Sequence, residues 1–390
     1  MKKVILAYSG GLDTSCCIPY LKEKGFRVIC FSAKIGQKEN FNEIKKRALR
    51  LGAEKIYIKD LLDEFLKDFI LPSLWAKSLY ESKYPLFTSL SRPLIAKYLV
   101  EIAKAEKTDF IAHGCTGKGN DQVRIEVSAK ILNPKIKILA PVREWHFKSR
   151  EEQAEFLLKK GLKLKVKKSH PYSLDENVWG LSIEAGPLED LRNPPPKDSY
   201  FLVRAPEFAI NKPIDLEIEL KEGIPFKLNG KKISFKKMIE ILREAGAKTG
   251  VGRIDMIENR LVGIKSREIY ETPQSVILHK VYEELYSLVL DRETLHFFDI
   301  LSSKYSELIY YGLFFTDLKI ALDKFFDYLR RFLTGKIKLR LYKGNIQILE
   351  RYAKHSLYKK ELATYSKGSV FNQKWAEGFI EIFRLPFIRK

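Results

Sequence analysis

A short stretch near the start of the chain combines two glycines with three side-chain hydroxyls. Residues 7–15 read Ala-Tyr-Ser-Gly-Gly-Leu-Asp-Thr-Ser and follow directly on an apolar run. Glycine can adopt backbone angles closed to other residues, so that amide N–H groups approach an anion closely. The hydroxyls add donors, and a helix that begins here directs its positive end at the anion. The pattern predicts a phosphate-binding turn between a strand and a helix, with an ordinary glycine turn as the alternative.

No lysine follows these glycines, although a nucleoside triphosphatase loop of the Gly-x-x-x-x-Gly-Lys-Ser/Thr kind requires one. The stretch instead resembles the pyrophosphate-binding loop of the ATP pyrophosphatases. Those enzymes split ATP between its α- and β-phosphates. The loop is therefore expected to hold the departing pyrophosphate.

A second glycine-rich stretch, residues 113–124, reads His-Gly-Cys-Thr-Gly-Lys-Gly-Asn-Asp-Gln-Val-Arg. Its three glycines predict a backbone nest that can hold a phosphate or a carboxylate. Arg124 can bind a carboxylate through two hydrogen bonds, and Asp121 can pair with an amino group. Alternatively, Asn120 or Asp121 caps the following helix. Together these residues predict recognition of an α-amino acid beside ATP.

Two further clusters combine polar and aromatic residues, at 84–93 and at 250–273. In the first, Tyr84 could belong to the core and Ser89 could cap a helix, apart from any role in binding. In the second, Glu258 could be an ion-pair partner and Tyr270 a packing aromatic. His113 is expected to be structural, because no cysteine, serine or carboxylate is spaced to form a catalytic triad with it.

Apolar runs alternate with helical periods in the first third of the chain. Strands are expected at 4–7, 28–32, 55–58, 110–112 and 136–142. Helices are expected at 15–24, 41–51, 61–78, 91–106 and 121–132. Such alternation, with buried β-branched strands, predicts an α/β fold with a doubly wound parallel sheet. Ligands of such sheets bind beyond the carboxyl ends of the strands, near a topological switch point, which is where both glycine-rich loops would lie.

Past about residue 166 the pattern predicts a second domain of the α+β class. Strands are expected at 215–220 and 225–233, a helix at 235–245, long helices at 275–311 (broken near Asp291 and Ser303) and 317–333, and a hairpin at 336–342 and 346–352. A final amphipathic helix is expected at 373–383. Its aromatic stripe requires an apolar partner, either a neighbouring subunit or the rest of its own chain.

The composition is typical of a soluble globular protein, with 390 residues, 45% hydrophobic and 31% charged. A net charge of +21 raises the alternative of nucleic-acid binding. However, the six lysines within 159–168 alternate with leucine and valine, which favours a solvated edge strand or helix-to-strand junction. Abundant lysine, glutamate and isoleucine also fit a protein from a hot environment. We expect no nucleic-acid partner.

The four cysteines show no metal-ligand spacing, so free thiols in a reducing cytoplasm are expected. No apolar run approaches membrane-spanning length, and the short run before the first glycine loop is not that of a signal peptide. The sequence therefore predicts a cytoplasmic protein with neither a membrane association nor a protein-bound metal.

Taken together, the clusters resemble the argininosuccinate synthase family, in that family's order and over essentially the whole chain. The matching motifs are the stretch 7–15, Ile35-Gly36-Gln37, Thr-Ser-Leu-Ser-Arg-Pro at 88–93, the stretch 113–124, Gly-Val-Gly-Arg-Ile-Asp at 250–255, Glu-Asn-Arg at 258–260, Ile-Tyr-Glu-Thr-Pro at 269–273, Ser-Leu-Tyr at 356–358 and the segment 372–379.

The resemblance implies an ATP-dependent carbon–nitrogen ligase that joins citrulline and aspartate into argininosuccinate, through a citrullyl-AMP intermediate, releasing AMP and pyrophosphate. It implies a nucleotide-binding domain at 1–166, a synthetase and multimerisation domain at 167–355, and a C-terminal arm for oligomerisation at 356–390. It also implies a homotetramer, with Mg²⁺ entering as Mg–ATP and not through a protein cage.

The resemblance also implies three sets of contacts. The ATP contacts are Ala7, Tyr8, Ser9, Gly10, Gly11, Leu12, Asp13, Thr14, Ser15, Ala33 and Gly114. The citrulline contacts are Tyr84, Ser89, Asn120, Arg124, Ser182, Glu258 and Tyr270. The aspartate contacts are Thr116, Asn120 and Asp121.

Several positions depart from the family pattern. Phe87 stands where glycine is common and is expected to narrow the citrulline pocket, and Cys115 replaces alanine. The segment 181–186 differs from Ile-Ser-Tyr-Glu-Gly-Gly, Leu191 replaces a common proline, and Arg267-Glu268 replaces Arg-Gly. None of these changes removes a residue of the phosphate loop or of the amino-acid cluster.

Two other functions are compatible with parts of the sequence. A tRNA-modifying ATP pyrophosphatase would account for the charge, but such enzymes usually need a catalytic cysteine pair, and the adjacent Cys16 and Cys17 are expected to point apart. A non-catalytic nucleotide-binding or assembly protein would leave Arg124, Asp121 and Glu258 unexplained.

Overall fold

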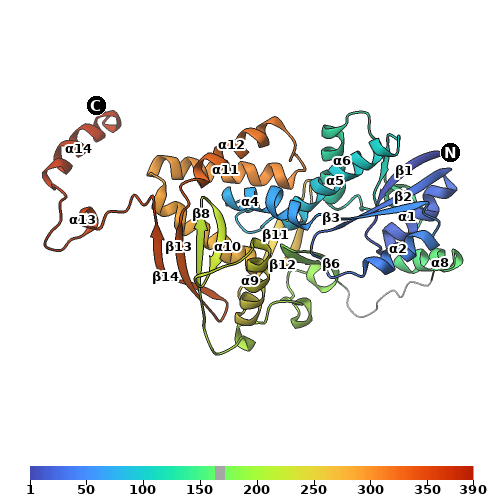
Figure 1. Cartoon of the computed structure of the whole chain (residues 1–390), viewed down its shortest axis with the longest axis horizontal. Coiled ribbons are helices and arrows are strands. Elements are labelled where there is room, and N and C mark those ends of the chain that lie inside the picture. The colour runs from blue at the N-terminus through green and yellow to red at the C-terminus, as the bar shows by residue number, and fades with distance from the viewer. Residues whose placement is uncertain (163–171, 390) are drawn as a thin grey trace.

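The computed structural model describes residues 1–162 and 172–389. Figure 1 shows the N-terminal α/β region at one end of the molecule, a C-terminal α+β region beside it, and an arm that stands away from both. The expected domain boundary after residue 166, and the end of the lysine-rich run 159–168, lie outside the described residues.

The N-terminal region is built on a five-stranded parallel sheet with the strand order β3-β2-β1-β4-β5. Its strands are β1 (Lys2–Ala7), β2 (Phe26–Lys34), β3 (Lys55–Asp60), β4 (Phe110–Ala112) and β5 (Lys137–Leu139). The chain moves outward from β1 to β3 and then returns to place β4 on the other side of β1. The topological switch point therefore lies between β1 and β4, which confirms the predicted doubly wound fold.

Helices cover both faces of this sheet because alternate residues of its central strand are buried on opposite sides. Val4 and Leu6 belong to a core cluster with Cys16 and Cys17, whereas Ile5 belongs to the larger core on the other face. The covering helices are α1 (Leu12–Glu23), α2 (Phe41–Arg50), α5 (Phe87–Ala105), α6 (Asp121–Leu132), α7 (Pro141–Glu144) and α8 (Arg150–Lys159). A β-branched strand buried on both sides is typical of parallel sheets.

The C-terminal region contains two antiparallel sheets. One has the order β10-β9-β8-β13-β14, from β8 (Ile214–Lys221), β9 (Ile224–Leu228), β10 (Lys231–Lys232), β13 (Gly335–Tyr342) and β14 (Asn345–Ala353). The other has the order β11-β12-β7-β6, from β6 (Ser173–Asn177), β7 (Gly180–Glu184), β11 (Arg253–Asn259) and β12 (Lys265–Glu271). The helices are α9 (Phe235–Thr249), α10 (Pro273–Val289), α11 (Arg292–Tyr310) and α12 (Asp317–Arg330).

Four expected elements were wrong in detail. The segment 225–233 is two strands, because a turn at Asn229 and Gly230 with positive φ interrupts it. The segment 61–78 is α3 (Leu62–Glu64), a π-helical stretch η1 (Phe65–Ile70) and α4 (Leu71–Trp75). The strand expected at 136–142 ends early because Pro141 begins α7. The break expected near Ser303 does not occur, since α11 continues through that residue.

The C-terminal arm follows β14 and contains α13 (Lys360–Ala363), α14 (Lys374–Arg384) and the short η5 (Leu385–Phe387). The final helix lies within one residue of the predicted segment. None of its residues is buried, and Figure 1 shows it apart from the two regions. The alternative that it packs on its own chain is therefore wrong.

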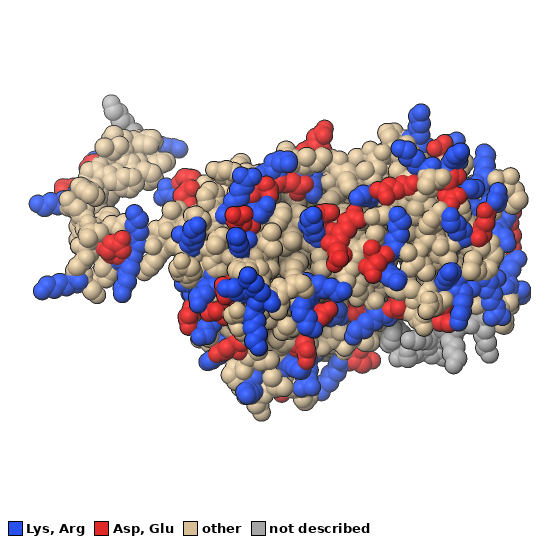
Figure 2. Space-filling model, viewed as in Figure 1, with Lys and Arg blue, Asp and Glu red and all other residues tan. Residues whose placement is uncertain are grey.

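Charged side chains of both signs are spread over the molecular surface. Figure 2 shows lysine and arginine over the whole face in view, with aspartate and glutamate interspersed among them. Mixed charge of this kind is typical of a solvated surface. Within the described residues, no helix is long and apolar enough to cross a membrane.

Candidate functional site

The turn between β1 and α1 has the conformation that its glycines predict. Gly10 has a φ of +79°, in the left-handed region, and a Cβ at this position would lie 2.9 Å from Ile44 Cγ1. The Arg47 guanidinium donates a hydrogen bond to the Gly10 carbonyl. Only glycine satisfies both the backbone angle and the close approach of α2.

Hydroxyl groups organise the inside of this turn. Ser9 Oγ accepts a hydrogen bond of 3.2 Å from the Gly11 N–H and lies 3.1 Å from Thr14 Oγ1. A Cβ on Gly114 would lie 2.9 Å from Thr14 Cγ2. The loop after β4 therefore packs directly against the start of α1, as expected for two loops at a switch point.

An element that the sequence analysis missed supports the same turn. Gln153 of α8 donates a hydrogen bond of 2.9 Å from Nε2 to Asp13 Oδ1 in the first turn of α1. The Cys16 thiol donates to the Gln153 carbonyl at 3.6 Å. Both contacts hold α8 against the first turns of α1.

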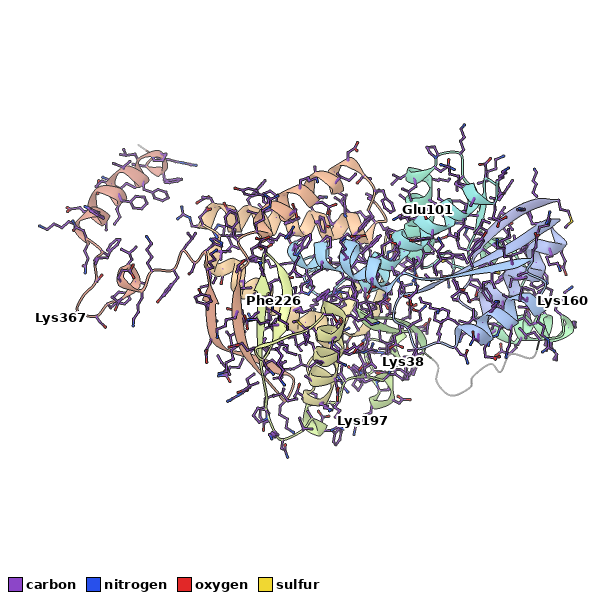
Figure 3. All side chains as sticks on the ribbon, in the orientation of Figure 1. Lys38, Glu101, Lys160, Lys197, Phe226 and Lys367 are labelled. Carbon is purple, nitrogen blue, oxygen red and sulfur yellow. The ribbon has the colours of Figure 1, made fainter. Side chains whose placement is uncertain are left out.

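A cleft of about 920 Å³ opens at the carboxyl ends of the parallel strands and extends to the sheet of β6, β7, β11 and β12. Most of the predicted contacts line it: Ala7, Tyr8, Ser9, Gly11, Leu12, Asp13, Thr14, Ala33, Tyr84, Gly114, Thr116, Asn120, Asp121, Arg124, Ser182, Glu258 and Tyr270. Lys38, labelled in Figure 3, also lines the cleft and lies where the N-terminal region meets the C-terminal region.

Three predicted contacts do not line this cleft, although they adjoin residues that do. Gly10 faces α2, and Ser15 is fully buried with its Oγ 3.3 Å from the Tyr8 hydroxyl. Ser89 is also fully buried, inside α5. Of these, Gly10 and Ser15 support the turn between β1 and α1 from the side away from the cleft.

Asn120 bridges two distant segments and does not cap α6. Its Nδ2 donates to the Tyr310 hydroxyl at 2.7 Å, and its Oδ1 accepts from the Leu261 N–H at 2.8 Å. The side chain makes no capping hydrogen bond to the helix. The capping alternative is therefore wrong for Asn120.

Asp121 lies between two arginines. Arg92 Nη2 is 2.7 Å from one carboxylate oxygen, and Arg124 Nη1 is 2.9 Å from the other. Burial opposes the charge of Asp121, but the attraction of both guanidinium groups outweighs it and lowers the pKa of the carboxyl. Arg92 also contacts Asp175 of β6. Asp121 is therefore an ionised carboxylate at the floor of the cleft.

Arg124 is almost fully buried and holds the end of α11. Its Nε donates to the Tyr310 carbonyl at 2.9 Å, and its guanidinium lies 4.5 Å from the centre of the Tyr310 ring. With one contact also made to Asp121, the remaining N–H groups of Arg124 are the ones available to a carboxylate in the cleft.

Two tyrosine hydroxyls hold the Glu258 carboxylate, which is only 4% exposed. Tyr270 donates to Oε2 at 2.6 Å and Tyr310 donates to Oε1 at 2.7 Å. Within the described part of the chain Glu258 forms no ion pair, so the alternative that it is an ion-pair partner is wrong. Burial raises the pKa of Tyr270, and the negative charge of Glu258 adds to that effect.

Stacked aromatic rings form the wall beside Glu258. Tyr84 stacks on Tyr270 with ring centres 4.3 Å apart, and Phe87 meets both rings edge to face. Phe87 is fully buried and does not line the cleft, so it lies behind this wall and does not narrow the pocket. A Cβ on Gly180 would lie 2.7 Å from the Phe87 ring, which shows how closely β7 approaches it.

Strand register places Ser182 of β7 directly opposite Tyr270 of β12. Both residues line the cleft. At the other end of the cleft, Ala33 lies near the end of β2, where its carbonyl accepts a hydrogen bond of 2.7 Å from Gln37 Nε2. The pairing of the central antiparallel strands thus brings the serine to the predicted citrulline cluster.

The sequence analysis assigned no role to Arg92, Asp175, Tyr310, Glu184, Arg260 or Glu268. Arg92 belongs to the motif at 88–93, and Arg260 to Glu-Asn-Arg, so the motifs were a usable signal for both. Tyr310 lies at the end of a long amphipathic helix and carried no such signal. Its contacts with Asn120 and Glu258 form only because the folded chain places the end of α11 next to both residues.

The histidine and cysteines of the region have structural roles. His113 is fully buried, with Nδ1 accepting from the Cys115 N–H at 3.2 Å and Nε2 3.0 Å from Glu126. Cys16 and Cys17 are fully buried in the core under β1. Burial raises the pKa of the Cys16 thiol to about 12 and also raises the pKa of the Cys17 thiol. The two cysteines therefore do not resemble a catalytic pair, which needs a thiolate near neutral pH.

The chain matches two family models. The model described as the arginosuccinate synthase N-terminal HUP domain matches residues 3–163, and the one described as the arginosuccinate synthase C-terminal domain matches residues 172–389. Together they span nearly all of the sequence.

Curated relatives are similar over almost their entire length. The argininosuccinate synthase of Carboxydothermus hydrogenoformans is 51% identical over 386 residues, which are 99% of this chain and 96% of that protein. The argininosuccinate synthase of Aquifex aeolicus is 49% identical over 387 residues, again 99% of this chain and 96% of that protein. A solved structure described as a predicted subunit of tRNA methyltransferase from Methanocaldococcus jannaschii aligns at 15% identity, covering 42% of this chain and 90% of that one, with a TM-score of 0.27.

Proposed function

The chain belongs to the argininosuccinate synthase family, and from this premise we propose how its cleft joins citrulline to aspartate. The protein is a carbon–nitrogen ligase of arginine biosynthesis that uses ATP as a substrate. The observation that carries the proposed mechanism is the direct contact between the β1–α1 turn and the loop after β4. That contact brings a phosphate-binding turn and an amino-acid cluster into one cleft.

The first step activates citrulline. Its ureido oxygen is a poor leaving group, so the oxygen first attacks the α-phosphorus of ATP, forming an O–P bond while the bond from that phosphorus to the bridging oxygen breaks. Pyrophosphate leaves and is held by the turn of residues 9–15. Hydroxyls and helix N–H groups there stabilise the charge that grows on the leaving group.

The second step joins the amino acids. The aspartate ammonium group first loses a proton to solvent. The resulting amine attacks the activated carbon, a C–N bond forms, the C–O bond to AMP breaks, and the nitrogen loses a second proton to solvent. Thr116, Asn120 and Asp121 position aspartate, with the ionised Asp121 beside its ammonium group before attack. Alignment of three substrates supplies much of the rate acceleration.

Citrulline occupies the wall made by the stacked tyrosines. Arg124 contacts its carboxylate, and Glu258 accepts hydrogen bonds from its N–H groups. Support comes from the burial and fixed geometry of both side chains and from the position of Ser182 beside Tyr270. Ser89, which is buried inside α5, would reach citrulline only after a local adjustment of that helix.

Mg²⁺ enters as part of the Mg–ATP substrate. The described residues contain no group of three or more histidine, cysteine, aspartate or glutamate side chains that could hold a metal ion. The phosphate oxygens of ATP are suitable ligands for Mg²⁺, which usually retains several waters in such complexes.

The three-part organisation assigns nucleotide binding to residues 1–166, synthesis and multimerisation to 167–355, and oligomer contacts to 356–390. Residues of the two larger parts line the same cleft, which supports a site in which one part binds the nucleotide and the other contributes to synthesis. The four cysteines form no disulfide, which supports a location in the reducing cytoplasm.

The active form is a homotetramer in which the C-terminal arm binds neighbouring subunits. Trp375, Phe379 and Phe383 of α14 are 70%, 61% and 56% exposed, and an apolar stripe of this size favours a protein partner. Sedimentation equilibrium tests this assembly. A triple change of these residues to serine should reduce the mass from four chains to fewer, whereas an unchanged mass would contradict the role of the arm.

Product analysis tests the reaction itself. We expect AMP and pyrophosphate from ATP, and argininosuccinate only when both citrulline and aspartate are supplied. Omission of citrulline should abolish AMP formation, because there is no oxygen nucleophile. Formation of ADP, or AMP release that ignores both amino acids, would contradict the assignment.

A conservative change, Arg124→Lys, should raise KM for citrulline, while Arg143→Lys, outside the predicted contacts, serves as its control.

A further inference from the structure

Glu268 places a carboxylate in the wall of the cleft. The side chain lies on β12, opposite Met256 of β11, and is only 3% exposed. Glu268 lines the cleft although no substrate contact is predicted for it. A carboxylate that is buried in a substrate cleft without a role in the reaction calls for an explanation.

One arginine connects Glu268 to the expected aspartate loop. Arg260 Nη2 lies 2.6 Å from Glu268 Oε1 and 2.5 Å from Glu184 Oε2. The same guanidinium donates from Nη1 to the Lys118 carbonyl at 3.3 Å. Lys118 lies between Thr116 and Asn120, so Arg260 connects the carboxyl pair to the loop that positions aspartate.

Charged groups from several elements face this pair. Glu184 comes from β7, Glu258 from β11, Arg260 from the turn after β11, and Asp121 from the start of α6. The hydroxyl of Ser266 donates to Glu268 at 2.8 Å. Arg267 offers no further compensation, because it pairs with Asp255 at 2.6 Å.

A single guanidinium cannot neutralise two carboxylates beside a third. Burial raises the pKa of Glu268 to about 8, and the charges of Glu184 and Glu258 add to that effect against the opposing attraction of Arg260. Burial likewise raises the pKa of Glu184. The pair therefore retains one proton near neutral pH and loses it as the pH rises through about 8.

We propose that Glu268 is a specificity-determining residue for the anionic amino acid: with Glu184 it engages Arg260, and the charge of this carboxyl pair controls how well the cleft accepts aspartate. The inference rests on the proposed function of the cleft. Aspartate carries a net negative charge and is repelled by an additional carboxylate nearby. Citrulline is a neutral zwitterion, so its binding depends much less on that charge.

The sign of the effect follows from the proton count. At about pH 6.5, the wild-type pair and a Glu268→Gln variant carry the same net charge, because the wild-type pair holds one proton. At about pH 9, the wild-type pair has lost it and carries one more negative charge than the variant. KM for aspartate should therefore be higher in the wild type only at alkaline pH.

Steady-state kinetics of AMP formation by the full-length protein test the proposal. We expect the ratio of the wild-type KM for aspartate to that of Glu268→Gln to rise from about one at pH 6.5 to about three- to tenfold at pH 9. The ratio for citrulline should stay near one. Because the wild type and the variant are compared at the same pH, any effect of the titration of aspartate itself on KM is the same for both and cancels in the ratio.

Two further variants complete the experiment. Asp255→Asn removes a carboxylate from the same hairpin but outside the cleft and should leave the pH dependence unchanged. Glu268→Gly removes the same charge as Glu268→Gln and should show the same ratio, so it decides the question if the glutamine variant does not fold.

A ratio that is independent of pH, or one that shifts equally for both amino acids, would overturn the role of Glu268. AMP formation that does not depend on citrulline and aspartate would instead overturn the proposed function.

Discussion

The Tyr310 hydroxyl donates a hydrogen bond of 2.7 Å to Glu258, although 52 residues separate them in the chain. The same hydroxyl accepts from Asn120 Nδ2 at 2.7 Å. Tyr310, at the end of α11, thus connects two parts of the cleft. One is the wall of tyrosines and Glu258 that is expected to bind citrulline. The other is the start of α6, which is expected to bind both amino acids. The orientation of Glu258 depends on this contact.

Replacement of Tyr310 by phenylalanine should weaken citrulline binding. The change removes one hydrogen bond from the buried Glu258 and leaves Asn120 Nδ2 without its acceptor. We expect KM for citrulline to rise about tenfold, equivalent to about 1.4 kcal/mol, with a smaller change in KM for ATP. Tyr311→Phe is the control, because the hydroxyl at this adjacent position is bonded to neither Glu258 nor Asn120. Equal effects of the two changes would contradict the role of Tyr310.

Replacement of Gly10 by alanine should impair both stability and ATP binding. The positive φ costs about 1–2 kcal/mol, and the contact with Ile44 adds about 1–3 kcal/mol. Gly25→Ala is a matched control, because Gly25 also has a positive φ of +83° but no neighbouring atom within 4 Å of the added Cβ. Denaturant unfolding and KM for ATP should show the larger loss for Gly10→Ala. Indistinguishable variants would argue against the close packing of the turn.

Phe87 and Gly180 should show strong coupling in a double-mutant cycle. Phe87→Ala should cost about 3–5 kcal/mol of unfolding free energy because it leaves a cavity behind Tyr84 and Tyr270. Gly180→Ala should cost about 1–3 kcal/mol because its Cβ would meet the phenylalanine ring. In the double variant the ring is gone, so the total should fall short of the sum by about 1–2 kcal/mol. Strict additivity would show that the two residues do not touch.

The Cys115 thiol should react slowly although it lines the cleft. Burial raises the pKa of Cys115 to about 12, and the negative charge of Asp121 contributes to the increase. At about pH 8 the thiolate fraction is therefore well below that of an ordinary thiol, whose pKa is about 8.5. Timed alkylation with iodoacetamide, followed by mass spectrometry, should modify Cys115 only after denaturation. Rapid modification of the folded protein, with loss of activity, would contradict this environment.

Local patterns were sufficient to predict the glycine turn between β1 and α1. The apolar run of β1, the glycines and the hydroxyls are adjacent in sequence, and each acts over a few residues. The same holds for α6, whose bounds were predicted correctly. Strand and helix alternation then placed both loops at one edge of the sheet, because parallel strands direct their carboxyl ends the same way.

The hairpin of β11 and β12 shows where local patterns failed. Its dense charge concealed two strands, since buried and exposed positions both carry ionisable groups. Arg267 pairs with Asp255 on one side, while Arg260 is held between two glutamates on the other. Such pairing becomes visible only when the opposing strand and its register are known.

The amino-acid sequence by itself determined the α/β fold, the glycine turn between β1 and α1 and the residue types expected to recognise amino acids, because these depend on short-range conformational preferences and on side-chain chemistry. Only the tertiary structure decided which partners those residues have. The contacts of Tyr310 with Glu258, Arg92 with Asp121 and Gln153 with Asp13 join distant segments of the chain. Their geometry depends on the ends and packing of whole helices and strands, which no local pattern specifies.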